Sequence, residues 1–173
     1  METKRYFLFL KFKGTNYHGW QIQPNGMSVQ EEVENALGVL FQKKVAIMAA
    51  GRTDAGVHAS CMVAHFECDK EIVKKDFIFH LNNILSDSIS IFDLREVALD
   101  FHARFAATSR TYHYKISTKK NPFQEDITYR YSKYVDLEKM NQAAKMLLGE
   151  KDFSCFSKSK TQTFTNNCKL EKA

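Results

Sequence analysis

The order of apolar segments over about the first hundred residues restricts the fold more than any other feature of this sequence. Short apolar or aromatic runs, which are typical of buried strands, are interspersed with two longer segments in which apolar residues recur at helical spacing. The order is strand, helix, strand, strand, helix, strand, which is the ferredoxin-like pattern. We therefore expect an α+β fold with one sheet and helices on one of its faces. The predicted strands are 6–12, 45–50, 62–66 and 89–97, and the predicted helices are 28–42 and 74–85.

Ser28 marks the start of the first predicted helix. Together with Glu31, three residues later, it forms a capping box. Apolar residues then recur on one face of the helix, and they are Val29, Val33, Ala36, Leu37, Leu40 and Phe41.

Residues 101–173 are expected to form part of a second α/β domain, after a first domain that spans 1–100. A strand is predicted over 108–118, with Tyr112 and Tyr114 on one face, and an amphipathic helix over 137–148. After Gly149 we find only a short aromatic segment and a polar tail, so no further strand is predicted. The second domain is therefore expected to be incomplete.

The chain has 173 residues, a formal net charge of +5 and a pI of about 9.0. This mild basic excess favours a polyanionic partner without establishing one. The four cysteines lack the spacing of a zinc site, which indicates reduced thiols and a cytoplasmic location. Charged residues interrupt the apolar N-terminal segment, so we expect neither a signal peptide nor a membrane span.

A glycine-bounded turn between the second and third predicted strands holds an arginine and a carboxylate two positions apart. Gly51 and Gly56 bracket Arg52 and Asp54, and glycine allows both unusual backbone angles and the close approach of a ligand. In an extended segment Arg52 and Asp54 would project from the same side, and the guanidinium would keep the acid ionised. The pattern predicts a positioned acid that a substrate can reach.

Each of these residues also has a plainer interpretation. Asp54 in a Thr-Asp-Ala-Gly sequence could cap the turn locally, and Arg52 could form a simple ion pair instead of contacting RNA. His58 could act in acid–base chemistry, but packing or bonding within the turn is the favoured interpretation. Trp20, with Gln21 and Gln23 beside it, could contact RNA or lie in the core.

The nine residues from Gly51 to Ala59 resemble the active-site motif of the TruA family of tRNA pseudouridine synthases. Other segments that resemble the family follow in the same order along the chain. They are Gly19-Trp20-Gln21-Ile22-Gln23, Phe101-His102-Ala103-Arg104-Phe105, Ser109-Arg110-Thr111-Tyr112, Asp152-Phe153-Ser154-Cys155-Phe156 and Asn167-Cys168. The resemblance covers essentially the whole chain.

The resemblance implies that Asp54 is the nucleophile of an isomerase that breaks the N1–C1′ bond of uridine, turns the base and rejoins it through C5. The implied substrates are uridines on the 3′ side of the anticodon stem-loop of tRNA. Arg52 would assist base flipping or pair with Asp54, and the ring of Tyr112 would stack on the flipped base. Arg104 and Arg110 could hold backbone phosphates.

The resemblance further implies a homodimer, a site in the cleft between two domains, and no metal or other cofactor. Relatives carry additional carboxyl-terminal sequence, so we expect this polypeptide to be a shortened form whose activity is impaired or absent. The rival interpretation is a noncatalytic RNA-binding module of the RRM type. The chain lacks the RNP1 pattern of such modules, and a binding module has no need for Arg52 and Asp54.

Overall fold

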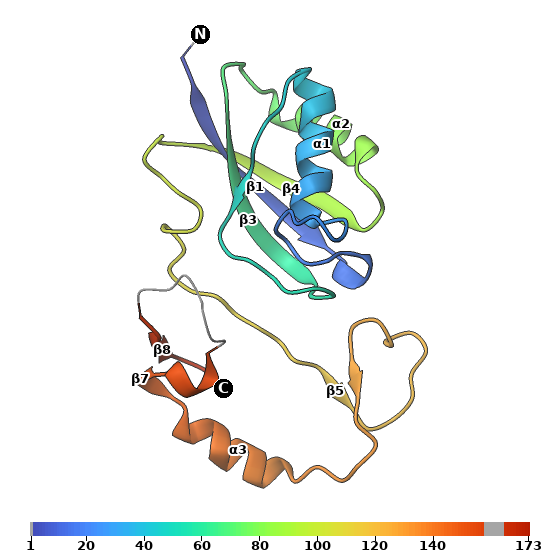
Figure 1. Cartoon of the computed structure of the whole chain (residues 1–173), viewed down its shortest axis with the longest axis vertical. Coiled ribbons are helices and arrows are strands. Elements are labelled where there is room, and N and C mark those ends of the chain that lie inside the picture. Colours follow the sequence, from blue (N-terminus) through green and yellow to red (C-terminus); the bar gives the residue numbers. More distant parts are fainter. Residues whose placement is uncertain (1, 158–164) are drawn as a thin grey trace. The chain divides into compact units, whose positions relative to one another are not determined.

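The computed structural model describes residues 2–157 and 165–173. Its contacts divide the chain into two units, Met1–Tyr114 and Lys115–Ala173, which are coloured blue to yellow and yellow to red in Figure 1. This division groups 101–114 with the first unit. The boundary expected after residue 100 separates two domains that fold independently, whereas this division groups residues by their contacts. The expected boundary therefore stays a prediction.

The first unit is built on a four-stranded antiparallel sheet with the strand order β2-β3-β1-β4. The strands are β1 (Lys4–Phe12), β2 (Met48–Ala49), β3 (Ala59–Cys68) and β4 (Ile89–Val97). The helices α1 (Val29–Phe41) and α2 (Lys74–Ile84) lie together on one face of this sheet (Figure 1). The order of elements along the chain is the predicted one, and the mixed α/β architecture is confirmed.

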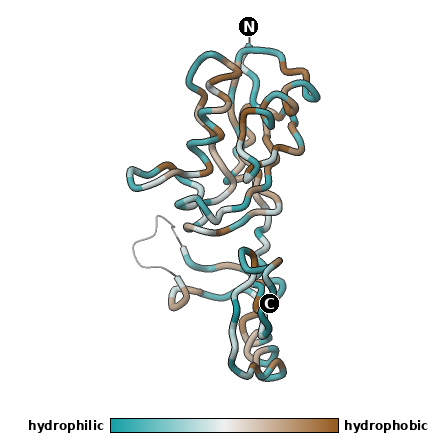
Figure 2. Tube along the Cα trace, turned by 90° about the vertical axis from the view of Figure 1, so that its right-hand side faces the viewer, coloured by the Kyte–Doolittle hydropathy of each residue, from teal (hydrophilic) through white to brown (hydrophobic). Residues whose placement is uncertain are grey.

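The core lies between that face and the helices, because every second side chain of the central strand β1 is buried. In β1 the residues Tyr6, Leu8, Leu10 and Phe12 are buried, and each large apolar side chain removed from water contributes about 1.5 to 3 kcal/mol. Hydrophobic and hydrophilic stretches accordingly alternate along the trace in Figure 2.

Helix α1 begins as the sequence predicts. The Ser28 hydroxyl accepts a hydrogen bond from the Glu31 backbone N–H at 3.2 Å, and the helix ends where Gln42 adopts a left-handed backbone with φ of 57°. The predicted apolar face is the buried one, since Val29, Val33 and Leu37 are fully buried.

The strand expected over 45–50 is wrong in extent, because only Met48–Ala49 pairs with β3. Side chains of α1 satisfy the backbone just before it. Glu34 Oε1 accepts from the Ile47 N–H at 3.0 Å, and Gln30 Nε2 donates to the Ile47 carbonyl at 3.2 Å. Val45 and Ile47 are still buried. The apolar pattern of 45–50 therefore indicated burial correctly but not strand pairing.

In the second unit, residues 115–157 and 165–173 form two small sheets, one α-helix and one 3-10 helix. The pair β5 (Ile116–Ser117) and β6 (Tyr129–Arg130) is parallel, and the pair β7 (Gly149–Asp152) and β8 (Asn167–Leu170) is antiparallel. Helix α3 (Leu137–Met146) starts at Asp136, whose side chain accepts from the Lys139 N–H at 3.0 Å. A short 3-10 helix, Ser154–Phe156, follows β7.

Two predictions for this region are wrong. Strands do follow residue 148, but β7 reads Gly-Glu-Lys-Asp and is exposed throughout, so no apolar alternation marks it. The strand expected over 108–118 is reduced to Ile116–Ser117, because within the described residues no strand pairs with 108–114. A run of alternating aromatic residues becomes a strand only when a neighbouring strand accepts its hydrogen bonds.

Candidate active site

Asp54 lies on the turn that joins β2 to β3. The turn is closed by a hydrogen bond from the Val57 N–H to the Asp54 carbonyl at 3.3 Å, and its start is fixed by one from the Ala50 N–H to the Val63 carbonyl at 2.8 Å. Residues 51–58 contain no strand, so Arg52 and Asp54 are not held by pairing with a neighbouring strand. The Asp54 side chain is exposed, where a substrate can reach it.

Two glycines from the segment before α1 press directly against this turn. A Cβ atom at Gly19 would lie 2.2 Å from the Thr53 carbonyl oxygen, and one at Gly14 would lie 2.0 Å from the Val57 carbonyl oxygen. Real Cβ atoms do not come so close to another heavy atom, so only glycine permits this packing of backbone on backbone. Gly19 also has a φ of +84°, in the region that favours glycine.

Hydrogen bonds join the same two segments. The Trp20 N–H donates to the Thr53 carbonyl at 3.1 Å, and the Gly56 N–H donates to the Tyr17 carbonyl at 3.2 Å. The Asp54 turn is therefore held from both sides by residues 14–20. Sequence reasoning missed this role of Gly14 and Gly19, because their contact partners, Val57 and Thr53, are distant in the sequence and no local pattern indicates these contacts.

Trp20 is a core residue. Its side chain is 3% exposed and its ring lies 6.1 Å from that of Phe12. Its carbonyl accepts from the Gln30 N–H at 3.0 Å, and the Gly19 carbonyl accepts from the Val29 N–H at 3.2 Å. Both bonds satisfy free donors in the first turn of α1, so the helix positions the segment that supports Asp54. The neighbouring Gln21 and Gln23 are exposed.

His58 bonds into the same arrangement. Its Nδ1 accepts a hydrogen bond from the Gly14 N–H at 3.1 Å, which requires that nitrogen to be unprotonated. Thr53 Oγ1 is buried and has no hydrogen-bond partner among residues 2–157 and 165–173. A buried hydroxyl without a partner costs free energy. Holding the turn in this shape therefore costs the free energy of the unpaired Thr53 hydroxyl.

Arg52 and Asp54 are both exposed, and in the described part of the chain no ion pair joins them. The two charges are therefore both available to an incoming ligand. Tyr112 is 75% exposed, and no hydrogen bond or ring contact joins it to Asp54 within the described ranges.

Arg110 ties two segments of the first unit together. Its guanidinium donates to the Ala50 carbonyl at 2.7 Å and to the Arg104 carbonyl at 3.2 Å. Its Nε would lie 3.5 Å from a Cβ atom at Gly51, so the side chain packs against the start of the motif. Arg104 is exposed, and its backbone N–H donates to His102 Nδ1 at 3.1 Å.

The strand that leaves the turn carries a buried histidine on the sheet face opposite the helices. His65 in β3 is 7% exposed, its Nδ1 accepts from the Ala103 N–H at 3.2 Å, and its ring centroid lies 4.5 Å from that of His102. Burial, followed by the positive charges of His102 and Arg5, lowers the pKa of His65 to about 4. His65 therefore stays neutral near pH 7 and anchors 101–106 to the sheet.

The described residues contain no group of three His, Cys, Asp or Glu side chains that could hold a metal ion. None of the helices in that part of the chain is long and apolar enough to cross a membrane. Each of its four cysteines is a free thiol.

Comparison with known proteins gives a consistent result. Residues 9–106 match the family described as tRNA pseudouridine synthase. The chain is 46% identical over 171 residues to tRNA pseudouridine synthase A of Parabacteroides distasonis, covering 98% of this chain and 68% of that protein. The enzyme of the same name from Bacteroides fragilis is 48% identical over 171 residues with the same coverage, and that of Bacteroides thetaiotaomicron is 48% identical over 170 residues, 63% of its length. The matched family segment contains the whole Asp54 turn and the residues that support it, and the chain therefore belongs to the tRNA pseudouridine synthase family of isomerases.

Proposed function

We propose that this protein converts uridine to pseudouridine in tRNA and that Asp54 is the nucleophile. The observation that carries the proposal is an exposed carboxylate on a turn whose backbone is braced by Gly14, Gly19 and Tyr17. A nucleophile works best when its position is fixed before the substrate arrives.

The reaction is an isomerisation, so every atom of the uridine is retained. The N1–C1′ bond breaks, the base turns, a C5–C1′ bond forms, and the proton lost from C5 is balanced by one gained at N1. Asp54 could add to the sugar, add to the base, or take the C5 proton. In each case the carboxylate is released unchanged, so no oxidant, reductant or cofactor is needed.

The target base has to leave its stack before Asp54 can reach it, which costs a few kcal/mol. Tyr112 exposes most of its ring, and stacking on an aromatic ring contributes about 1 to 3 kcal/mol per base. Arg52 has a guanidinium with no carboxylate partner in the part of the chain that the structure describes, so it is available to fill the vacated space or contact a phosphate.

We assign different tasks to Arg104 and Arg110. Arg104 is exposed and suited to a phosphate contact. Arg110 acts as a positioning residue, because its guanidinium is already committed to the carbonyls of Ala50 and Arg104.

Three finer assignments belong to the same proposal. The substrate uridines lie in the anticodon stem-loop, the protein acts as a homodimer in the cytoplasm, and the first unit has a ferredoxin-like topology. The first two are what the resemblance of the sequence motifs implies, and the strand order β2-β3-β1-β4 with both helices on one face supports the third.

The test compares the wild-type chain with Asp54→Asn, using chemical mapping of pseudouridine in tRNA. Asp54→Asn should abolish product and leave tRNA affinity nearly unchanged, because the amide keeps the shape of the side chain but is a poor nucleophile. Asp100→Asn is the matched control, since Asp100 is also an exposed acid of the first unit. Retained product with Asp54→Asn would exclude Asp54 as the nucleophile. No product from the wild-type chain would contradict the proposed activity and agree with the loss of activity expected for a shortened form, whereas full turnover would contradict that expectation.

A further inference from the structure

The net positive charge of the chain is confined to its second unit. Lys115–Ala173 holds 12 of the 25 Lys and Arg residues but only 7 of the 20 Asp and Glu residues, a net charge of +5. The whole chain also carries +5, so the first unit, which holds the Asp54 turn, is neutral overall. A polyanionic substrate is therefore attracted chiefly to residues outside the first unit.

Part of this charge lines a pocket beside β5 and β6. The two strands are parallel, with Ile116 opposite Tyr129 and Ser117 opposite Arg130, so residues 118–128 form the connecting loop. Hydrogen bonds fold this loop, including one from the Gln124 N–H to the Asn121 carbonyl at 3.1 Å and one from the Ile127 N–H to the Gln124 carbonyl at 3.1 Å. The pocket between loop and strands has a volume of about 350 Å³.

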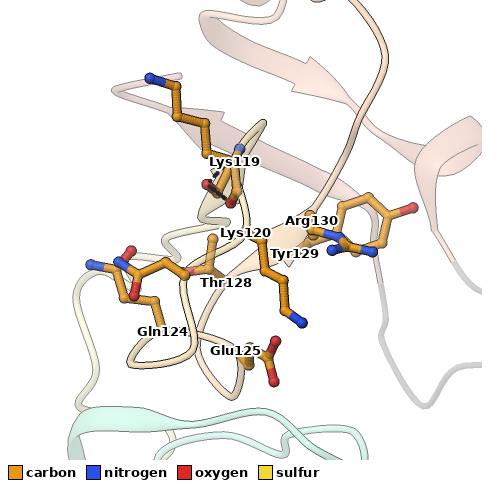
Figure 3. A pocket seen from close by; sticks show the side chains of 9 residues that line it. Lys119, Lys120, Gln124, Glu125, Thr128, Tyr129 and Arg130 are labelled. Carbon is orange, nitrogen blue, oxygen red and sulfur yellow. Dashed lines mark hydrogen bonds between the residues drawn. The ribbon is translucent and has the colours of Figure 1, made fainter.

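Three cations, Lys119, Lys120 and Arg130, line this cationic pocket, against a single carboxylate from Glu125. The rest of the lining consists of Tyr129 and four uncharged polar side chains. Figure 3 shows Lys120, from the loop after β5, and Arg130, from β6, among the side chains that surround the pocket, whereas Lys119 extends away from them. Among the residues described, none of the three cations forms an ion pair.

This lining suits a phosphate group better than an apolar ligand. Pockets for small organic molecules are lined mostly by apolar and aromatic side chains, whereas here Tyr129 is the one aromatic residue among polar and charged ones. The planar fork of an arginine matches two phosphate oxygens, and a lysine adds a point charge. When lysines or arginines neutralise phosphates, counterions condensed on the nucleic acid are released, and this release supplies much of the affinity for nucleic acids.

We propose that the cationic pocket binds a backbone phosphate of the RNA substrate, as a docking contact separate from the Asp54 turn. The identity of the RNA as tRNA rests on the proposed function above. Phosphate contacts position an RNA without reading its sequence, so the pocket contributes to tRNA affinity and takes no part in the chemical step.

The test measures tRNA binding by the full 173-residue chain as a function of salt, using fluorescence anisotropy. The variant Lys120→Gln/Arg130→Gln is expected to bind tRNA about tenfold more weakly, and its slope of log K against log salt should be smaller by about 1 to 2. The matched control is Lys139→Gln/Lys169→Gln, which removes the same formal charge from the same unit. Lys139 and Lys169 already face Asp136 and Glu171, each at 3.5 Å, so the control slope should change less.

Equal slopes for wild type and Lys120→Gln/Arg130→Gln would overturn the proposal. Circular dichroism checks that both variants are folded, and acetylation of the wild-type chain gives a second readout, in which RNA should protect Lys120 more than Lys139. If inorganic phosphate protects Lys120 from acetylation and RNA gives no additional protection, the pocket is a free-anion site and the proposal is also overturned.

Pseudouridine mapping separates the two proposals. A reduced salt slope without product contradicts only the proposed function, and product with an unchanged slope contradicts only the pocket proposal.

Discussion

Single glycines decide whether the Asp54 turn can rest on the segment before α1. Three glycines at this contact separate two physical effects. Gly56 has a φ of +79° and open space around it, Gly14 has a blocked Cβ position without a positive φ, and Gly19 has both. Backbone strain and steric exclusion can therefore be measured apart.

We predict that Gly56→Ala costs about 1 to 2 kcal/mol of unfolding free energy, from left-handed backbone strain alone. Gly14→Ala and Gly19→Ala should cost more, because a carbonyl about 2 Å away has to move. They should also lower the rate of pseudouridine formation, since the displaced carbonyls belong to Thr53 and Val57. Urea unfolding and single-turnover assays measure both effects, and an equal cost for Gly19→Ala and Gly56→Ala would contradict the steric explanation.

Residue-scale features differ in how far the sequence predicts them. Gly51, Asp54 and Gly56 stand out because they are close together in one motif. Gly14 and Gly19 do not, because their function is defined by backbone atoms of residues 53–57. Trp20 could not be assigned to core or RNA from its type alone, and its burial against Phe12 decides for the core.

At the scale of elements, local signals predicted the helices well and the strand pairing less well. Helix α1 starts at the capping box that Ser28 and Glu31 form, which is a signal contained within four residues. Strands depend on partners elsewhere. The backbone of Ile47 is held by side chains of α1 instead of by β3, and β7 pairs with β8 although its residues are polar and exposed. Neither fact is visible in an apolar pattern.

The link between β2 and the segment after His102 gives a prediction at this scale. Arg110→Gln should lower the unfolding free energy by about 0.5 to 1.5 kcal/mol, because two exposed carbonyls lose a charged donor. It should slow turnover while leaving the salt dependence of tRNA binding unchanged. Arg104→Gln gives the contrast, because it removes the same charge from the side chain that we assign to a phosphate contact and should therefore lower the salt slope by about 1. A fall of about 1 in the salt slope for Arg110→Gln would contradict the positioning role and indicate a phosphate contact.

At the scale of the whole molecule, charge and core are distributed differently. The large buried core belongs to the first unit, which is neutral, and the excess of cations belongs to the second. The net charge of +5 predicted a polyanionic partner from composition alone, but composition could not show which unit carries it. The family resemblance identified the reaction, whereas the distribution of charge and the bracing of the Asp54 turn required the three-dimensional structure.

Acid stability of the first unit depends on His65, which connects β3 to the segment that follows β4. Its pKa of about 4 in the folded protein lies below the usual value of 6.5, because burial and nearby positive charge disfavour the protonated ring. The stabilisation is therefore fully present above about pH 6.5 and is lost as the pH falls toward 4, with a magnitude on the order of 3 kcal/mol.

The variant His65→Asn retains an acceptor near the position of Nδ1 but does not titrate in this range. We predict that it loses less unfolding free energy than wild type between pH 7 and pH 4, as measured by urea unfolding. His80→Asn, at an exposed position of α2, should follow the wild-type pH dependence. If His65→Asn and wild type lose stability in parallel, the acid sensitivity of this unit arises from its carboxylates and not from the buried histidine.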